Sequence, residues 1–236
     1  MIFVCLLLFA SEDAKAARQL LDGSIVALGG EKRLSAPHAL TGQSKGTLSL
    51  DAAQEIRNQF TVQGLDQMKW ETQIGTGSIQ LGLNKSSLWI ASNNGRGNDA
   101  PKEMILAFRR GFAALRIAET LVDLRGKDWK LSCLGELKID DTPAIGLKAS
   151  RRGEPDLDLW FDAKTRLPLK VELRLQKPGE SAEMTLSAVL RDYRKSGGRQ
   201  FFGKMTVYHD GTKVLEVERS DVKVVDRLDD TTFDKP

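Results

Sequence analysis

Residues that could act as acids, bases or nucleophiles form no recognisable catalytic cluster in this sequence. Its only two histidines are His38 and His209. His38 starts a predicted strand, and His209 precedes Asp210-Gly211, which is typical of a tight turn between strands. We expect no G-x-S-x-G turn of the kind that exposes a serine nucleophile. The sequence therefore predicts a non-enzymatic protein without catalytic residues.

Metal and nucleotide sites are also not indicated. The cysteines, Cys5 and Cys133, are far apart, the histidines do not form an H-x-x-x-H pair, and acidic residues gather in turns such as Asp229-Asp230. Gly75-Thr76-Gly77 lacks the third glycine and the following helix of a dinucleotide loop. We predict no metal and no cofactor.

Apolar residues on one helix are the main functional signal. A helix is expected from about Pro101 to Leu124, because apolar and small residues recur there at alternating steps of four and three and so share one face. They are Met104, Phe108, Gly111, Leu115, Ala118 and Val122. Gly111 and Ala118 are small, which leaves space along this face.

Four tryptophans also lie in predicted strands. Each one, taken singly, is better explained as ordinary core. Together with the helix they predict a hydrophobic cavity, because a wide sheet that curls around one helix is not filled by that helix. The candidate lining residues are Trp70, Trp89, Met104, Phe108, Leu115 and Trp160. Cavities of about 300–1,000 Å³ suit small apolar ligands, and each buried methylene contributes about 0.8 kcal/mol.

The elements that must position these residues are mostly strands. Apolar and polar residues alternate over about eleven or twelve segments, as expected of an antiparallel sheet with one dry face. The segments are 39–50, 54–63, 66–74, 77–84, 86–92, 129–139, 143–150, 156–162, 167–176, 183–193, 200–208 and 213–223. With an N-terminal helix from about Ala14 to Leu28, the fold class is mainly β: a curved antiparallel sheet holding one central amphipathic helix on its concave side.

The N-terminus predicts export. Ile2 to Ala10 is apolar but shorter than the about 20 residues that span a bilayer, and Ala14-Lys15-Ala16 resembles a signal-peptidase site. We expect residues 1–16 to be a signal peptide whose basic start lies upstream, and 17–236 to be one domain in the periplasm or elsewhere in the cell envelope. The alternative is a soluble chain whose first strand is Ile2–Phe9.

The charge distribution argues against nucleic acid as a partner. The net charge is only +3, and basic doublets such as Arg109-Arg110 and Arg151-Arg152 are scattered rather than arranged in a stripe. Peripheral attraction to an anionic membrane surface remains open.

Several different short motifs lie at spaced positions along the chain. They are Phe60-Thr61-Val62, Gln67-Met68-Lys69-Trp70-Glu71, Leu88-Trp89-Ile90, Leu159-Trp160-Phe161-Asp162 with Thr165 and Leu167-Pro168, Lys170-Val171-Glu172, and Leu228-Asp229-Asp230-Thr231-Thr232-Phe233. These motifs and the order of elements resemble the periplasmic carriers and receptors that sort lipoproteins to the bacterial outer membrane, the LolA and LolB type. The hairpin pattern Phe-Asp-x-x-Thr-x-Leu-Pro is the most specific of them.

The resemblance implies an unclosed β-barrel capped by helices, with a hydrophobic cavity for lipid or lipoprotein acyl chains. The family's carriers hold the lid closed with an arginine before an aromatic residue in an early strand. Lys69 occupies the matching position, and it lacks the planar fork of arginine. Lys69 is therefore the candidate lid contact.

Two functions follow as hypotheses. The first is an exported carrier or sensor of lipid-like ligands; the second is an envelope protein-protein interaction module of the same fold without a ligand. An exposed apolar groove would favour the carrier, whereas a sealed interior with a large flat apolar patch would favour the module.

Overall fold

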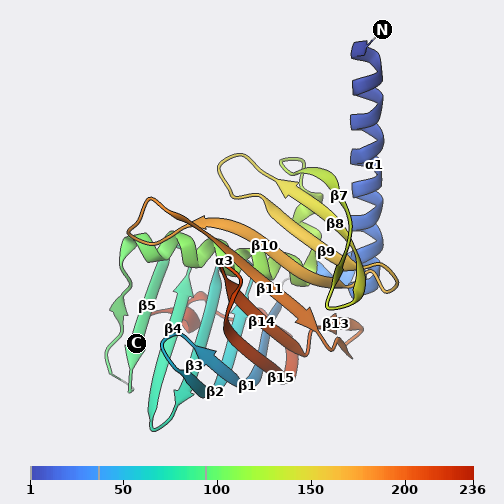
Figure 1. Ribbon diagram of the computed structural model, residues 1–236. Helices are drawn as coiled ribbons and strands as arrows, with labels where there is room; N and C mark the ends of the chain where they lie inside the picture. Colours follow the sequence, from blue (N-terminus) through green and yellow to red (C-terminus); the bar gives the residue numbers. More distant parts are fainter. Residues whose placement is uncertain (1, 37, 94) are drawn as a thin grey trace.

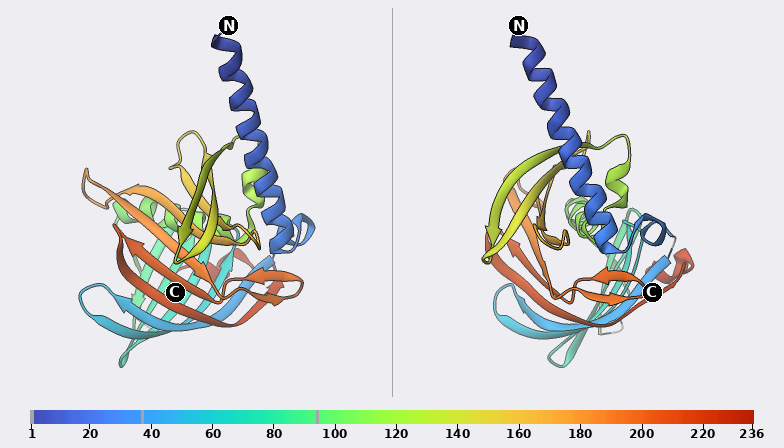
Figure 2. Two further views of the ribbon diagram at one scale, coloured as in Figure 1. Left: turned by 45° about the vertical axis from the view of Figure 1, so that its right-hand side comes forward. Right: turned by 90° about the vertical axis from the view of Figure 1, so that its right-hand side faces the viewer.

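The computed structural model describes the backbone of residues 2–36, 38–93 and 95–236, and side chains from Glu12 onward within those ranges. One large antiparallel sheet dominates the molecule and curves around a helix that lies inside the curve (Figure 1). The curve stays open on one side (Figure 2). The predicted mainly β class and the unclosed barrel are therefore confirmed.

Thirteen strands form the large sheet, in the order β6-β5-β4-β3-β2-β1-β15-β14-β11-β10-β9-β8-β7. Its strands are β1 (His38–Ser49), β2 (Ala53–Gln63), β3 (Gln67–Ile74), β4 (Gly77–Asn84), β5 (Ser87–Ser92), β6 (Asn98–Asp99), β7 (Lys130–Ile139), β8 (Thr142–Ser150), β9 (Leu157–Asp162), β10 (Pro168–Gln176), β11 (Glu183–Arg191), β14 (Lys204–His209) and β15 (Thr212–Asp226). A separate hairpin pairs β12 (Arg194–Ser196) with β13 (Arg199–Phe201). Because β15 pairs with β1, the last strand joins two meanders into one sheet.

Alternation of apolar and polar residues explains the strands, and β10 illustrates it. Leu169, Val171, Leu173 and Leu175 are buried, while the residues between them are more exposed. The hairpin before β10 turns where the motif predicts, because the Asp162 carboxylate accepts the N–H groups of Lys164 and Thr165 at 2.8 and 2.7 Å. Arg166 completes the turn with a φ of 62°.

Helix α1 (Ile2–Leu28) runs along one end of the sheet and extends beyond it (Figures 1 and 2). It is longer than the predicted helix, and the alternative strand over Ile2–Phe9 is wrong, because the backbone there is helical. The structure does not describe the side chains of residues 1–11, which belong to the predicted signal peptide. Within the described part of the chain, none of the helices contains an apolar stretch that could span a bilayer. The short α2 (Glu31–Leu34) follows α1.

The central helix α3 (Lys102–Thr120) is shorter than predicted. It ends at Leu121, whose φ of 61° is left-handed and whose N–H bonds to the Ile117 carbonyl at 2.6 Å. A 3₁₀ helix, η1 (Val122–Arg125), follows, so Val122 leaves the predicted helical stripe. Leu121 and Leu124 are fully buried in the core that α1 and α3 share with the sheet. Burial of Leu121 and Leu124 in the core thus outweighs the helical periodicity, which continues in the sequence beyond the end of α3.

Candidate functional site

A pocket of ≈ 410 Å³, here called the apolar pocket, lies between α3 and the concave face of the sheet. Its described lining is apolar except for His209. The lining residues are Leu48, Leu50, Trp70, Met104, Ala107, Phe108, Gly111, Phe112, Ala114, Leu115, Val171, Leu173, Leu175, Pro178, Met184, Leu186, Ala188, Met205, Val207, His209, Val214 and Leu215. Leu50 is 68% exposed and Met104 is 40% exposed, so the pocket opens to solvent.

Helical spacing explains how α3 lines the apolar pocket. Each residue advances about 100° around a helix axis, which places Met104, Phe108, Gly111 and Leu115 on one side. Gly111 allows a close approach there, because a Cβ on it would stand 2.7 Å from the end of the Leu186 side chain, which would have to shift. The Phe108 ring meets Trp70 edge to face, with centroids 6.4 Å apart. This side of α3 thus packs directly against the sheet.

The structure brings four of the predicted lining residues together: Trp70, Met104, Phe108 and Leu115 all line the apolar pocket. Sequence reasoning did not identify the facing side chains of β10, β11 and β14, among them Val171 and Ala188. Their alternation is visible in the sequence, but nothing in it tells which strands face α3.

Trp89 and Trp160, also predicted as lining residues, lie outside the described lining of the apolar pocket. In β5 the buried inward residue is Leu88, so Trp89 faces the other side, where its Nε1 donates to the Phe233 carbonyl at 2.9 Å. In β9 the inward residue is Leu159, and the Trp160 ring lies over Gly146 on the outer face. A step of one residue along a strand reverses the face.

Lys69, the candidate lid contact, does not line the apolar pocket. It lies next to Trp70 on β3 and therefore on the opposite face from the apolar pocket. Its Nζ is 3.5 Å from the Glu71 carboxylate, with which it forms a partly exposed ion pair. The strand alternation that directs Trp70 toward α3 directs Lys69 away from it.

Two residues that could in principle take part in catalysis are Ser44 and His209, and their surroundings do not favour it. The G-x-S-x-G pattern occurs at Gly42–Gly46, but within β1, where buried Ser44 accepts a hydrogen bond from Asn58 at 3.0 Å. A serine inside a strand is not the exposed turn that activates a nucleophile. Burial lowers the pKa of His209, so this pocket residue is neutral at pH 7. The arrangement favours apolar binding over bond breaking.

A buried ion network anchors the C-terminal half of α3. The Glu119 carboxylate pairs with Arg116 on the same helix and, at 2.5 Å, with Arg219 of β15. Arg116 also donates to the Gly64 carbonyl at 3.1 Å, and the Arg219 guanidinium lies 3.8 Å from the Phe202 ring. Burial lowers the pKa of Arg116 and of Arg219 to about 9, so both stay protonated at pH 7. The network ties α3 to both halves of the sheet.

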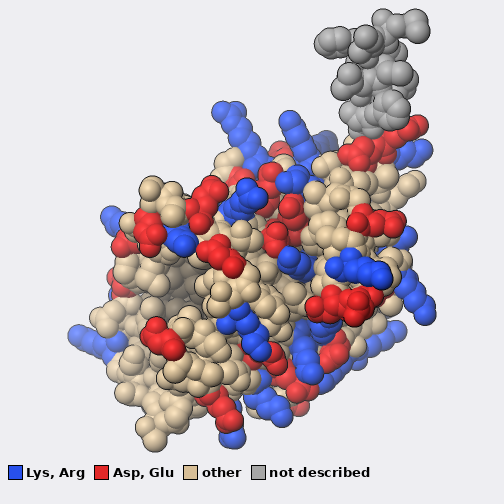
Figure 3. All heavy atoms as spheres, viewed as in Figure 1, with Lys and Arg blue, Asp and Glu red and all other residues tan. Residues whose placement is uncertain are grey.

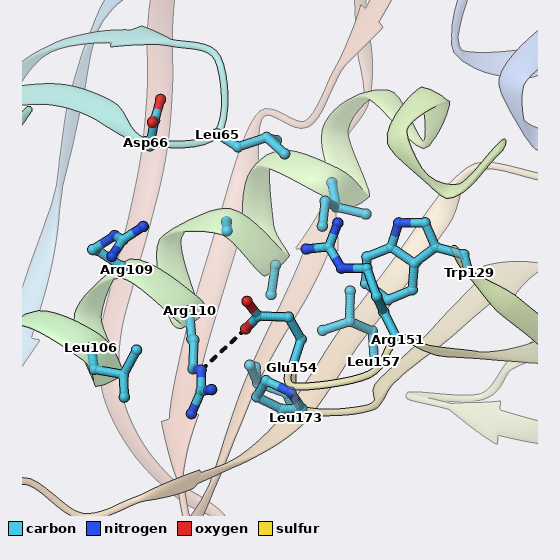
Figure 4. Close-up of a pocket in the computed structure, with 14 residues that line it drawn as sticks. Leu65, Asp66, Leu106, Arg109, Arg110, Trp129, Arg151, Glu154, Leu157 and Leu173 are labelled. Carbon is cyan, nitrogen blue, oxygen red and sulfur yellow. Dashed lines mark hydrogen bonds and ion pairs between the residues drawn. The ribbon is translucent and has the colours of Figure 1, made fainter. Parts of the chain in front are cut away.

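A second pocket, of ≈ 430 Å³, lies on the other side of α3 and is here called the arginine pocket. Figure 4 shows Arg109 and Arg110 on α3 opposite Arg151 and Glu154, which lie on the segment between β8 and β9. Arg110 pairs with Glu154 at 3.2 Å across this pocket. Arg151 lies over the Trp129 ring at 4.5 Å. Sequence reasoning treated these arginines as scattered doublets.

Comparison by sequence finds no matching protein-family model and no significantly similar curated protein. Comparison by structure finds solved proteins of similar architecture, three of which are described here. A domain described as an outer membrane lipoprotein-sorting protein, from Vibrio parahaemolyticus, has a TM-score of 0.52 at 10% identity, with 94% of this chain and 97% of that chain covered. A DUF1329 family protein from Desulfovibrio piger has a TM-score of 0.58 at 9% identity, with 92% and 97% covered.

A LolA superfamily protein from Nitrosomonas europaea has a TM-score of 0.55 at 15% identity, with 93% of this chain and 97% of that chain covered. At these identities the similarity concerns architecture alone. The chain has the LolA-like fold, an open antiparallel sheet around a central helix, which the sequence motifs predicted.

Proposed function

We propose that this protein is an exported, non-enzymatic binding protein that holds lipid or lipoprotein acyl chains in the apolar pocket, as a carrier or sensor in the cell envelope. The observation that carries the proposal is the pocket itself: ≈ 410 Å³ lined by aliphatic and aromatic side chains. Its volume falls within the range of about 300–1,000 Å³ typical of small-molecule sites. The LolA-like fold supports the same reading.

The shape of the pocket favours a carrier over an interaction module. A module would bury its apolar residues and present a flat apolar patch. Here the opening at Leu50 and Met104 exposes apolar residues at the entrance of a concave space. One acyl chain of about fourteen carbons would gain about 0.8 kcal/mol for each methylene it buries, so no catalytic group is needed for binding.

We expect Leu115→Glu to abolish uptake of a fluorescent fatty acid while costing little stability. Leu115 is only partly buried and borders an open pocket, so a carboxylate there stays hydrated. Leu124→Glu is the matched control, because Leu124 is fully buried in the core. An unpaired buried charge costs several kcal/mol of a total stability of about 5–15 kcal/mol. Urea unfolding and fatty acid titration of both variants check this.

A second variant tests the pocket without adding charge. Ala107→Phe introduces a ring into the apolar pocket and is expected to reduce fatty acid uptake through lost volume. If the wild-type protein binds no fatty acid, and Leu115→Glu unfolds as readily as Leu124→Glu, the pocket is ordinary core and the proposal fails.

The export prediction has its own test. Among the described side chains, the buried apolar face of α1 begins at Ala17 and continues through Leu21 and Ile25 to Leu28. Cleavage after Ala16 would therefore keep this whole face. We expect N-terminal sequencing of the protein from its native host to read a start near Ala17. An intact Met1 on a cytosolic protein would contradict export.

A further inference from the structure

The arginine pocket is a second site, separate from the apolar pocket. On α3 its lining residues are Leu106, Arg109, Arg110, Ala113, Ala114 and Ile117. At about 100° per residue, Leu106, Arg110 and Ala113 lie on about the opposite side of the helix from Phe108 and Leu115. The two pockets share only Ala114 and Leu173 in their described linings, where α3 packs against β10. One helix thus forms a wall of each.

The arginine pocket has an apolar floor and a charged rim. Ile117, Leu157 and Leu173 are buried lining residues and form the floor, together with Ala113. The rim carries Arg109, Arg110 and Arg151 against two carboxylates, Asp66 and Glu154, so positive charge is in excess among the lining residues. Such a pocket matches a ligand that carries an anionic group on a small apolar body.

The three arginines of this pocket differ in how far their N–H groups already have partners. Arg110 donates to the Gly153 carbonyl at 2.9 Å and pairs with Glu154. Arg151 lies over the Trp129 ring, and its Nη1 is 3.9 Å from Asp123, a long contact. The Nε of Arg109 is buried with no hydrogen-bond partner among the described residues. Arg109 and Arg151 therefore retain hydrogen-bonding capacity, and an exposed pair such as Arg110–Glu154 is weakly held.

We propose that the arginine pocket binds a phosphate group, carried on a lipid or free, between Arg110 of α3 and Arg151 of the facing loop. Guanidinium forks pair well with phosphate oxygens, and a tetrahedral phosphate offers acceptors to donors from two directions. The phosphate competes with the Glu154 carboxylate for Arg110. Removing that carboxylate therefore strengthens binding.

The test is isothermal titration calorimetry of the full chain with three probes. They are dihexanoylphosphatidylglycerol, inorganic phosphate, and dihexanoylglycerol, which lacks the phosphate. We expect Arg110→Gln and Arg151→Gln to weaken binding of the phosphate-bearing probe about tenfold each, and Glu154→Gln to strengthen it. Arg152→Gln is the matched control, because it removes the same charge at the neighbouring position. Arg152 is exposed and lies outside the described lining.

The outcomes separate the sources of the phosphate. Tighter binding of the phospholipid than of inorganic phosphate assigns the site to a lipid headgroup, and equal binding assigns it to free phosphate. Binding that persists in Ala107→Phe places the phosphate outside the apolar pocket, so this inference and the acyl-chain proposal can fail separately. The inference is overturned if Arg152→Gln weakens binding as much as Arg151→Gln, or if neither phosphate probe binds. Equal binding of dihexanoylglycerol would overturn it as well.

Discussion

Glu119→Gln is expected to remove about 3–5 kcal/mol from the free energy of unfolding. The substitution leaves Arg116 and Arg219 protonated and buried without their shared carboxylate, since each is less than 10% exposed. Desolvated charges that lose their partner are among the most costly single changes in a folded protein. Urea unfolding followed by circular dichroism measures the loss, which should bring a domain of about 5–15 kcal/mol close to its limit.

The control for Glu119→Gln is Glu216→Gln. Glu216 pairs with Lys213 at 2.9 Å, but both side chains are more than half exposed. Exposed pairs contribute about 0–1 kcal/mol, so this variant should unfold almost as the wild type does. Equal small losses in the two variants would show that the network does not anchor α3.

Trp89→Ala is expected to cost about 3–5 kcal/mol, although Trp89 lies outside the apolar pocket. The ring is 1% exposed and packs over Gly82, where a Cβ would come within 2.1 Å of it. Its Nε1 also satisfies the Phe233 carbonyl, so the C-terminal 3₁₀ helix η2 (Asp230–Phe233) loses its anchor. Urea unfolding measures the stability, and limited proteolysis near residue 230 reports release of the C-terminal segment.

Trp160→Ala and Trp70→Ala complete this experiment. Trp160 is only partly buried on the outer face, so its loss should cost less, between about 0.5 and 3 kcal/mol, without changing fatty acid uptake. Trp70 lines the apolar pocket, so Trp70→Ala should reduce uptake. Reduced uptake by Trp160→Ala with normal uptake by Trp70→Ala would contradict the placement of the pocket.

The elements of this fold could be predicted because their signals are local. Strand alternation, as in Leu167–Leu175, depends only on the two-residue period of an extended chain, and the turn at Asp162 depends on its own side chain. The stripe of Met104, Phe108 and Leu115 follows from the helical period alone. These signals identified the mainly β class, the central helix and four of the six candidate lining residues.

The partners of these elements could not be predicted in the same way, because they depend on contacts between distant segments. Trp89 and Trp160 lie in apolar runs, so hydrophobicity does not indicate which face is inward; cross-strand Gly82 and Gly146 make the space that accepts them outside. Likewise, Arg110 and Glu154 meet only because α3 crosses β10 beside the segment between β8 and β9. The local periodicity of the sequence thus determines whether a segment becomes a helix or a strand. The pairing of β1 with β15 and the packing of α3 against the sheet determine which side chains line the same pocket.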